Sequence, residues 1–212
     1  MRTRRREDIR VIRQAAAVCL GYPEQDVIAT SGLLRAALAE SAPREAENFA
    51  PLLAFWDSSD PSMIQTHYVD IFDLSRKHSL YLSYWTDGDT RRRGEVLGAF
   101  KRRYRDSGFL VDLRGELPDF LPMVLEFAAL VDPDGGTELL QANRPGLELL
   151  RLALLDDASP YAGVLAAVCA TLPGASPADR AAVRRMAGSG PPAESVGLDP
   201  HDPRLLPVLG GR

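Results

Sequence analysis

The 212-residue sequence has few of the residue types on which most enzyme and metal sites are built. It contains only two cysteines, three histidines and two lysines. The cysteines, Cys19 and Cys169, lie far apart, and His67, His78 and His201 have no i,i+4 spacing to one another, which argues against a zinc site. Dinucleotide, phosphate-loop and G-x-S-x-G motifs are absent. The sequence therefore predicts no catalytic residue and no metal site.

Long apolar runs are missing as well. The longest weakly polar stretch, 161–172, is shorter than the roughly 20 residues that cross a membrane. The basic N-terminus is not followed by the apolar region of a secretory signal. Cys19 and Cys169 stand in apolar surroundings, so we expect buried, reduced thiols. These features predict a cytoplasmic protein that does not insert into membranes.

The overall composition is that of a globular protein. Hydrophobic residues make up 45% and charged residues 25%, and the formal net charge of −4 argues against a nucleic-acid-binding protein. Residues 188–212 differ, because they contain five glycines and five prolines and cannot hold a regular element. We therefore expect one domain over 1–187, followed by a flexible Pro/Gly-rich tail over 188–212.

Apolar residues recur with helical spacing nearly throughout, and no segment alternates convincingly like a strand. The sequence predicts an all-α, single-domain bundle of about 8–10 helices. Segment 79–85 fits either a short helix or an extended piece. The expected helices cover 6–20, 25–39, 43–56, 60–73, 87 or 89 to 107, 118–131, 137–156 with a break at 145–146, 160–172 and 177–187.

An aromatic pair stands out in segment 68–73. Tyr68 and Phe72 are i,i+4 neighbours, with Ile71 beside them, so they share one face of the predicted helix. Such a face is most simply part of a core. It could also form the aromatic wall of a groove that receives the apolar side of an amphipathic peptide.

The predicted helix over 91–105 is strongly basic, with seven basic residues and one acidic residue. Val96, Phe100 and Tyr104 form its apolar stripe, and Arg93 falls inside that stripe, where it needs a carboxylate partner. The basic face is either solvated or meets an anionic partner. A helical nucleic-acid-binding or regulatory module that uses this helix is therefore the alternative function.

Carboxylates gather in segment 116–126. Pro118 fits the first turn of the predicted helix, Asp119 fits there because helix N-termini favour negative charge, and Glu126 returns to the same face. We expect Glu116, Asp119 and Glu126 to pair with Arg93 in an ion-pair seam. Paired carboxylates also perform acid–base chemistry, but no substrate-pocket motif accompanies them here.

Four segments in the middle of the chain carry a resemblance to a known family. They are YVDIFDL at 68–74, SLYLSYW at 79–85, DTRRRG at 89–94 with YRDSGF downstream, and ELPDFLPMVLEFAAL at 116–130. In this order they resemble the nitrate reductase molybdenum-cofactor assembly chaperones of the NarJ type, also called delta subunits. These belong to the TorD/DmsD-like redox-enzyme maturation chaperones. Relatives that serve other reductases carry a Glu-Pro-x-Asp-His box, whereas residues 116–120 read Glu-Leu-Pro-Asp-Phe, which favours the nitrate reductase branch.

The resemblance implies an all-helical chaperone without catalytic activity. Such a protein binds the apo catalytic (alpha) subunit of respiratory nitrate reductase, partly through that subunit's N-terminal peptide. It keeps the client competent for insertion of molybdopterin guanine dinucleotide and binds no prosthetic group itself. Cofactor-delivery proteins would be further partners, and nucleic acid would not be one.

Residues and resemblance together predict a hydrophobic groove for a client helix. The expected client-peptide groove residues are Tyr68, Ile71, Phe72, Tyr81, Tyr84, Pro118, Phe120, Leu121 and Leu125. The ion-pair seam of Arg93, Glu116, Asp119 and Glu126 would fix the helices that form the groove walls.

Overall fold

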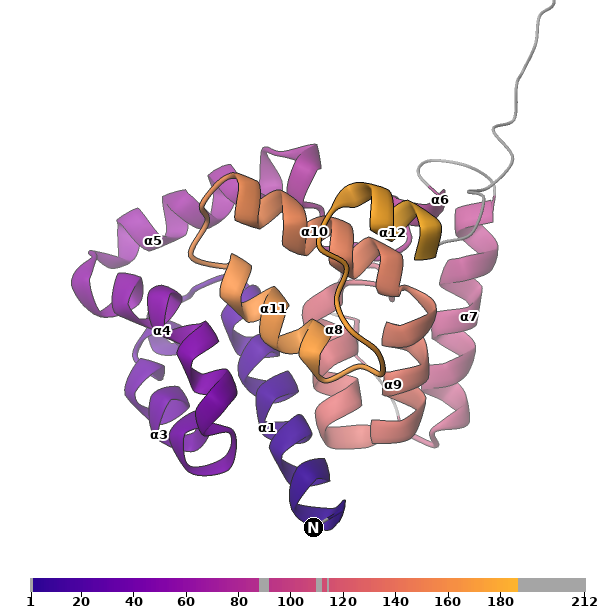
Figure 1. Ribbon diagram of the computed structural model, residues 1–212, viewed down its shortest axis with the longest axis horizontal. Coiled ribbons are helices and arrows are strands. Elements are labelled where there is room, and N and C mark those ends of the chain that lie inside the picture. The colour runs from indigo at the N-terminus through magenta and orange to yellow at the C-terminus, as the bar shows by residue number, and fades with distance from the viewer. Residues whose placement is uncertain (1, 88–91, 110–111, 114, 187–212) are drawn as a thin grey trace, which may run out of the picture.

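A computed structural model describes residues 2–87, 92–109, 112–113 and 115–186 (Figure 1). Every named element within these ranges is helical, which confirms the all-α prediction. The predicted tail lies outside the described residues. The elements are α1 (Arg2–Leu20), α2 (Gln25–Ile28), α3 (Ser31–Ser41), α4 (Pro43–Ser58), α5 (Pro61–Tyr68), the π-helix η1 (Val69–Asp73), the 3-10 helix η2 (Arg76–His78), α6 (Tyr84–Asp87), α7 (Arg92–Asp106), α8 (Leu121–Glu126), the π-helix η3 (Phe127–Val131), α9 (Pro133–Ala142), α10 (Arg144–Asp156), α11 (Ala162–Ala170) and α12 (Arg180–Met186).

Helix α1 runs through the middle of the molecule, with α3, α4 and α5 on one side and α7 and α9 on the other (Figure 1). It packs against α3, α8, η3 and α11. Ala16 and Leu20 of α1 are completely buried, as are Leu121 and Leu125 of α8. Helix α11 is apolar on all sides, as expected of a helix enclosed by others. These central helices form the core that positions the surface features described below.

Two glycines allow helices to approach at backbone distance. A Cβ atom on Gly163 of α11 would overlap the backbone carbonyl of Asn48 in α4. A Cβ atom on Gly136 of α9 would overlap Ala128 of η3. Both positions therefore require the absence of a side chain, because close-packed interiors have no room for an added methyl group.

Several predicted helix boundaries are wrong. The helix expected to begin at 137 begins at Pro133, and its break lies at Asn143 rather than at 145–146. The helix expected over 25–39 is interrupted at Thr30, whose hydroxyl donates to the Val27 carbonyl and ends α2 (2.6 Å). The helix expected to start at Pro118 starts at Leu121 instead, with Pro122 in its first turn. Ahead of it, the backbone N–H groups of Leu82 and Leu121 donate to the carbonyls of Asp119 and Leu80.

These two hydrogen bonds pair the segments 80–82 and 119–121. An isolated antiparallel bridge joins Tyr81 to Phe120, so the ambiguous segment 79–85 is extended at first and turns into α6 only at Tyr84. A tertiary contact has therefore overridden the helical preference of residues 118–120. Residues 79–85 and 116–120, which carry the family resemblance, are placed side by side by this pairing.

Cys19 and Cys169 are free, buried thiols, as expected. Burial raises the pKa of each thiol to about 12, so neither is a reactive thiolate near neutral pH. The described residues contain no cluster of three or more His, Cys, Asp or Glu side chains suited to a metal ion. No helix in the described ranges is both long and apolar enough to cross a membrane.

A buried ionic network fixes the C-terminal part of the described chain. Glu148 of α10 has no solvent exposure and accepts hydrogen bonds from Arg144 (3.4 Å) and Arg151 (2.7 Å). The same two arginines donate to the backbone carbonyls of Gly174 (2.9 Å) and Pro177 (2.6 Å). One carboxylate and two guanidinium groups thus hold residues 173–177, which lead from α11 to α12, against α10.

Candidate functional site

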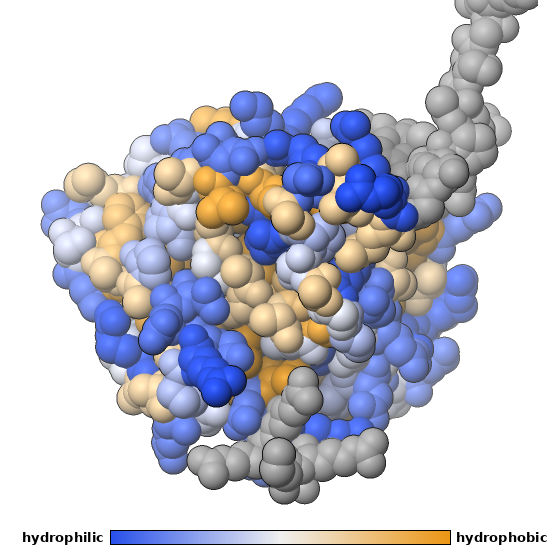
Figure 2. All heavy atoms as spheres, in the orientation of Figure 1, coloured by the Kyte–Doolittle hydropathy of each residue, from blue (hydrophilic) through white to orange (hydrophobic). Residues whose placement is uncertain are grey.

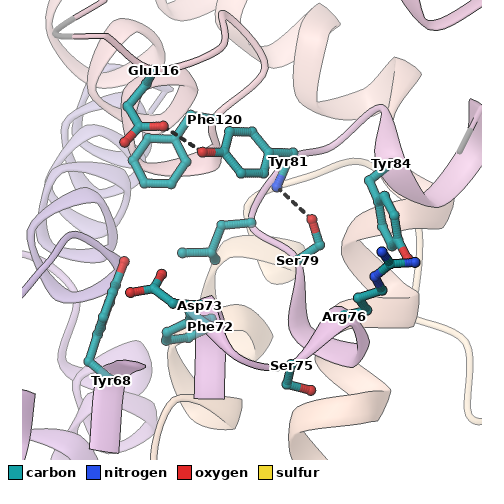
Figure 3. A pocket seen from close by; sticks show the side chains of 11 residues that line it. Tyr68, Phe72, Asp73, Ser75, Arg76, Ser79, Tyr81, Tyr84, Glu116 and Phe120 are labelled. Atoms are coloured by element: carbon teal, nitrogen blue, oxygen red, sulfur yellow. Dashed lines mark hydrogen bonds between the residues drawn. The ribbon is translucent and has the colours of Figure 1, made fainter. Parts of the chain in front are cut away.

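A small cavity of about 220 Å³ opens where η1 meets the paired segments 79–84 and 116–120. Figure 3 shows Glu116, Phe120 and the Tyr81 ring together on one side of it, with Tyr68 and Phe72 across from them. Five of its eleven lining residues are aromatic, and the lining comes from two parts of the chain that are distant in sequence, 68–84 and 116–120. The lining residues are Tyr68, Phe72, Asp73, Ser75, Arg76, Ser79, Leu80, Tyr81, Tyr84, Glu116 and Phe120.

The polar groups of the small cavity are coupled to one another. The Tyr81 hydroxyl donates a 2.5 Å hydrogen bond to Glu116 (Figure 3). Burial and this hydrogen bond raise the pKa of Tyr81, so that its phenol stays protonated as a donor. Burial and the nearby Glu116 carboxylate also raise the pKa of Asp73. The cavity therefore presents aromatic surface beside two carboxylates that repel each other.

A larger cavity of about 760 Å³ adjoins the first. Its floor comes from α1, α8 and η3, and its rims come from residues within 21–27 and from Asp112, Leu113 and Glu116. Its lining residues are Gln14, Ala17, Val18, Gly21, Tyr22, Glu24, Asp26, Val27, Asp112, Leu113, Glu116, Phe120, Pro122, Met123, Glu126, Phe127, Leu130 and Val131.

The two cavities are neighbours and share part of their lining. Glu116 and Phe120 line both of them. Tyr22 of the larger cavity also packs edge-on against Tyr68 of the smaller one, with ring centroids 5.5 Å apart. We call this combined surface, made of the lining residues of both cavities, the groove.

Large apolar side chains are exposed in the groove. Leu130 is 54% exposed and Tyr22 is 46% exposed, and both line the larger cavity. Leu74, which follows η1 between Asp73 and Ser75, is 75% exposed but lines neither cavity. Figure 2 shows the face that carries α10, α11 and α12, where hydrophobic side chains lie toward the middle and hydrophilic ones surround them. Apolar side chains that collect in a hollow, rather than being scattered singly, are typical of binding surfaces.

Both π-helices border the groove. In η1 the Leu74 N–H donates to the carbonyl of Val69, and this wider turn places Phe72 and Asp73 at the small cavity. In η3 the Asp132 N–H donates in the same way to Phe127, and η3 contributes to the floor of the larger cavity. Such turns are rare and are found disproportionately at functional sites.

The wall of the small cavity is held by Asp119, which is completely buried. Its carboxylate accepts hydrogen bonds from the backbone N–H (2.9 Å) and the hydroxyl (2.6 Å) of Ser83. The Arg93 Nε donates to the same hydroxyl at 3.1 Å. Arg93 of α7 is therefore connected to Asp119 through Ser83.

This arrangement replaces the predicted four-residue seam. Glu116 accepts from Tyr81, and Glu126 is exposed and lines the larger cavity. Asp119 and Glu126 do not share a helix face, because Asp119 precedes the first turn of α8. The two carboxylates expected to fix helices therefore lie on the groove surface instead.

Five of the nine predicted groove residues line the small cavity, namely Tyr68, Phe72, Tyr81, Tyr84 and Phe120. The other four are placed elsewhere. Ile71 packs partly buried against the core, Pro118 is buried, and Leu121 and Leu125 are completely buried beneath the groove. The reason is the shifted start of α8, which turns these two leucines into the core.

The larger cavity was not predicted from the sequence. The one sequence feature that points to this cavity is Tyr22. The segment Gly21-Tyr22-Pro23 is typical of a helix end, and the Tyr22 side chain is nearly half exposed. Gln14, Ala17 and Val18 share a face of α1, and Gly21 follows that helix. This face gives no apolar stripe in the sequence that would indicate a cavity.

Helix α7 packs one face inward, as its apolar stripe predicted. Phe100 and Tyr104 are buried, and the Tyr104 hydroxyl donates to the Pro118 carbonyl at 2.6 Å. Lys101, Arg102 and Arg105 are exposed, which fits a solvated basic face.

Comparison with known proteins places this fold in a family. A family model described as the nitrate reductase delta subunit matches residues 35–167. The nitrate reductase-like protein NarX of Mycobacterium tuberculosis is 44% identical over 161 residues, which cover 76% of this chain and 24% of NarX. The chain thus spans about a quarter of the length of that relative.

Relatives closer in length bear chaperone names. A protein of Bacillus subtilis named "probable nitrate reductase molybdenum cofactor assembly chaperone NarJ" is 31% identical, and the match covers 78% of this chain and 90% of that one. The Escherichia coli K12 nitrate reductase molybdenum cofactor assembly chaperone NarJ is 35% identical over 49% of this chain and 43% of its own length.

A solved structure shares the fold. A redox enzyme maturation protein from Archaeoglobus fulgidus superposes with a TM-score of 0.56 at 20% identity, covering 78% of this chain and 91% of that one. The family match over residues 35–167 and the 31% identical relative from Bacillus subtilis show that the chain belongs to the nitrate reductase delta subunit family.

Proposed function

We propose that this protein is an assembly chaperone that binds the apo catalytic subunit of respiratory nitrate reductase. The N-terminal segment of that subunit lies as a helix in the groove, and the client stays competent to receive molybdopterin guanine dinucleotide. Family membership and the names of the relatives support the assembly role. The observation that carries the binding mode is the groove of two neighbouring cavities, which leaves large apolar side chains exposed.

The size of the groove suits a reversible partner. Three or four apolar anchors contribute about 1.5–3 kcal/mol each when buried. Ordering the peptide costs about 2–5 kcal/mol. The balance corresponds to a Kd near micromolar or somewhat weaker. A chaperone must release its client once assembly is complete, and affinity in this range permits release.

In this proposal the chain works by binding, and the molybdenum cofactor belongs to the client. The only described thiols are buried with raised pKa values, so the described residues offer no nucleophilic cysteine. Cofactor-delivery proteins would meet the client while the chaperone holds it. A nucleic-acid-binding role has less support, because α7 buries its apolar face in the fold and its exposed arginines and lysine form only an ordinary basic helix surface.

The assembly role is tested by co-expression. The catalytic subunit of nitrate reductase from the same genome is produced in a host that lacks delta-type chaperones, with and without this chain. We expect the purified subunit to contain molybdenum only when the chain is present, and bound molybdenum is measured by elemental analysis. Equal molybdenum content in both preparations would contradict the proposal.

A further inference from the structure

The larger cavity combines an apolar floor with charge of one sign. Five carboxylates are among its lining residues, and none of the lining residues that the structure describes is lysine or arginine. The carboxylates are Glu24, Asp26, Asp112, Glu116 and Glu126.

These carboxylates come from three separate parts of the chain. Glu24 and Asp26 belong to the turn after α1 and to α2, Asp112 and Glu116 belong to the segment before α8, and Glu126 ends α8. The apolar floor between them is made by α1, α8 and η3. The carboxylates therefore surround the apolar floor, where they would contact a partner bound in the larger cavity.

The fold itself provides no ion-pair partner for most of this charge. Within the described ranges, no ion pair involves Glu24, Asp26 or Glu126. The two arginines of α1 nearest the cavity in sequence, Arg10 and Arg13, have partners elsewhere. Arg13 is buried and donates to Thr137, whereas Arg10 lies one turn before the cavity and donates to the Ala129 carbonyl.

Holding like charges around an apolar trough raises the free energy of the empty groove, because the carboxylates repel one another. The raised pKa of Asp73, caused by burial and by Glu116, shows that this repulsion extends into the small cavity. A cationic partner would relieve the repulsion, and a neutral one would not.

From this charge complementarity we infer that the groove selects a cationic amphipathic helix. The apolar face of that helix lies on the floor, and its lysine or arginine side chains reach the rim carboxylates. The inference rests on the proposed function and specifies its partner, namely that the N-terminal segment of the catalytic subunit has this character. Charge, rather than apolar surface alone, then distinguishes the client from other exposed amphipathic segments.

The test uses three synthetic peptides of about 15 residues, a helix of roughly 22 Å. They share the same leucine and phenylalanine positions, and their remaining positions are lysine, glutamine or glutamate. Calorimetric titration of the full chain is expected to show the lysine peptide binding about tenfold or more tightly than the glutamine peptide at low salt. The glutamate peptide should show no measurable binding. The advantage of lysine should shrink several-fold at roughly 0.5 M salt, because salt screens exposed charges.

A double variant locates the effect. Glu24→Gln with Glu126→Gln should weaken binding of the lysine peptide about fivefold and leave the glutamine peptide unchanged. Glu40→Gln with Glu47→Gln, two exposed carboxylates outside both cavities, is the matched control and should change neither.

Two results would overturn the inference, and they differ in what they leave standing. If the lysine and glutamine peptides bind equally well at low salt, charge selection is wrong while the groove remains a peptide site. If none of the three peptides binds, and the N-terminal peptide of the catalytic subunit does not bind either, both the inference and the proposed binding mode fail.

Discussion

Replacing Phe120 by alanine is expected to weaken binding of the client's N-terminal peptide about 10- to 100-fold. Phe120 lines both cavities and packs on the Tyr81 ring at a centroid distance of 5.5 Å. It is the apolar residue through which the two cavities join, and truncating such an anchor costs about 1.5–3 kcal/mol of binding free energy. The affinity is measured by calorimetric titration.

The variant should remain folded, because Phe120 is only partly buried and lies before α8 rather than in the core. Far-ultraviolet circular dichroism checks this. The control is Leu155→Ala, which removes a 57% exposed leucine of α10 that lines neither cavity and should leave affinity unchanged. A Phe120→Ala affinity within twofold of the original would rule out the groove as the binding surface.

The largest expected loss of stability comes from replacing Glu148 by glutamine. Arg144 and Arg151 would keep their positive charges in a site where their side chains are 3% and 13% exposed, with no carboxylate between them. Breaking a buried ion pair by neutralising one partner costs about 3–5 kcal/mol. Urea unfolding should show that decrease in the free energy of unfolding.

Arg180→Ala is the matched comparison. It breaks an ion pair with Asp156 whose side chains are 51% and 54% exposed, and such pairs contribute about 0–1 kcal/mol. If Glu148→Gln costs no more than Arg180→Ala, the carboxylate does not hold residues 173–177 in the way described. Comparing the loss in the free energy of unfolding between the two variants thus measures how burial changes the contribution of an ion pair to stability.

The helical class was readable from the sequence because it depends on local periodicity. The apolar stripe of α7 and the stop at Gly108, which has a φ of 77°, follow directly from residue pattern and glycine chemistry. The start of α8 was not readable. Pro118 is an acceptable first-turn residue, but hydrogen bonds from Leu82 and Leu121 across to Asp119 and Leu80 hold it outside the helix. Nothing in the local sequence encodes a pairing between segments that are nearly 40 residues apart.

Only the part of the groove that depends on local sequence motifs was predictable. Tyr68, Phe72 and Tyr81 were identified as aromatic residues on motif segments, and their convergence on one cavity follows from the fold. For Glu116 and Glu126 the sequence predicts ion pairs, whereas both line the larger cavity. A sequence does not show which side chains remain uncovered after the helices pack. The larger cavity depends on how α1, α8 and η3 pack, which is a tertiary property with no short-range signal.

The most direct test of the central claim is calorimetric titration of the full chain with the N-terminal peptide of the nitrate reductase catalytic subunit encoded in the same genome. The account predicts one-to-one binding with a Kd near micromolar or somewhat weaker and a negative heat-capacity change, the mark of apolar burial. Absence of binding, with duplex DNA bound instead in a strongly salt-dependent manner, would contradict it and would point to the basic face of α7 as the functional surface.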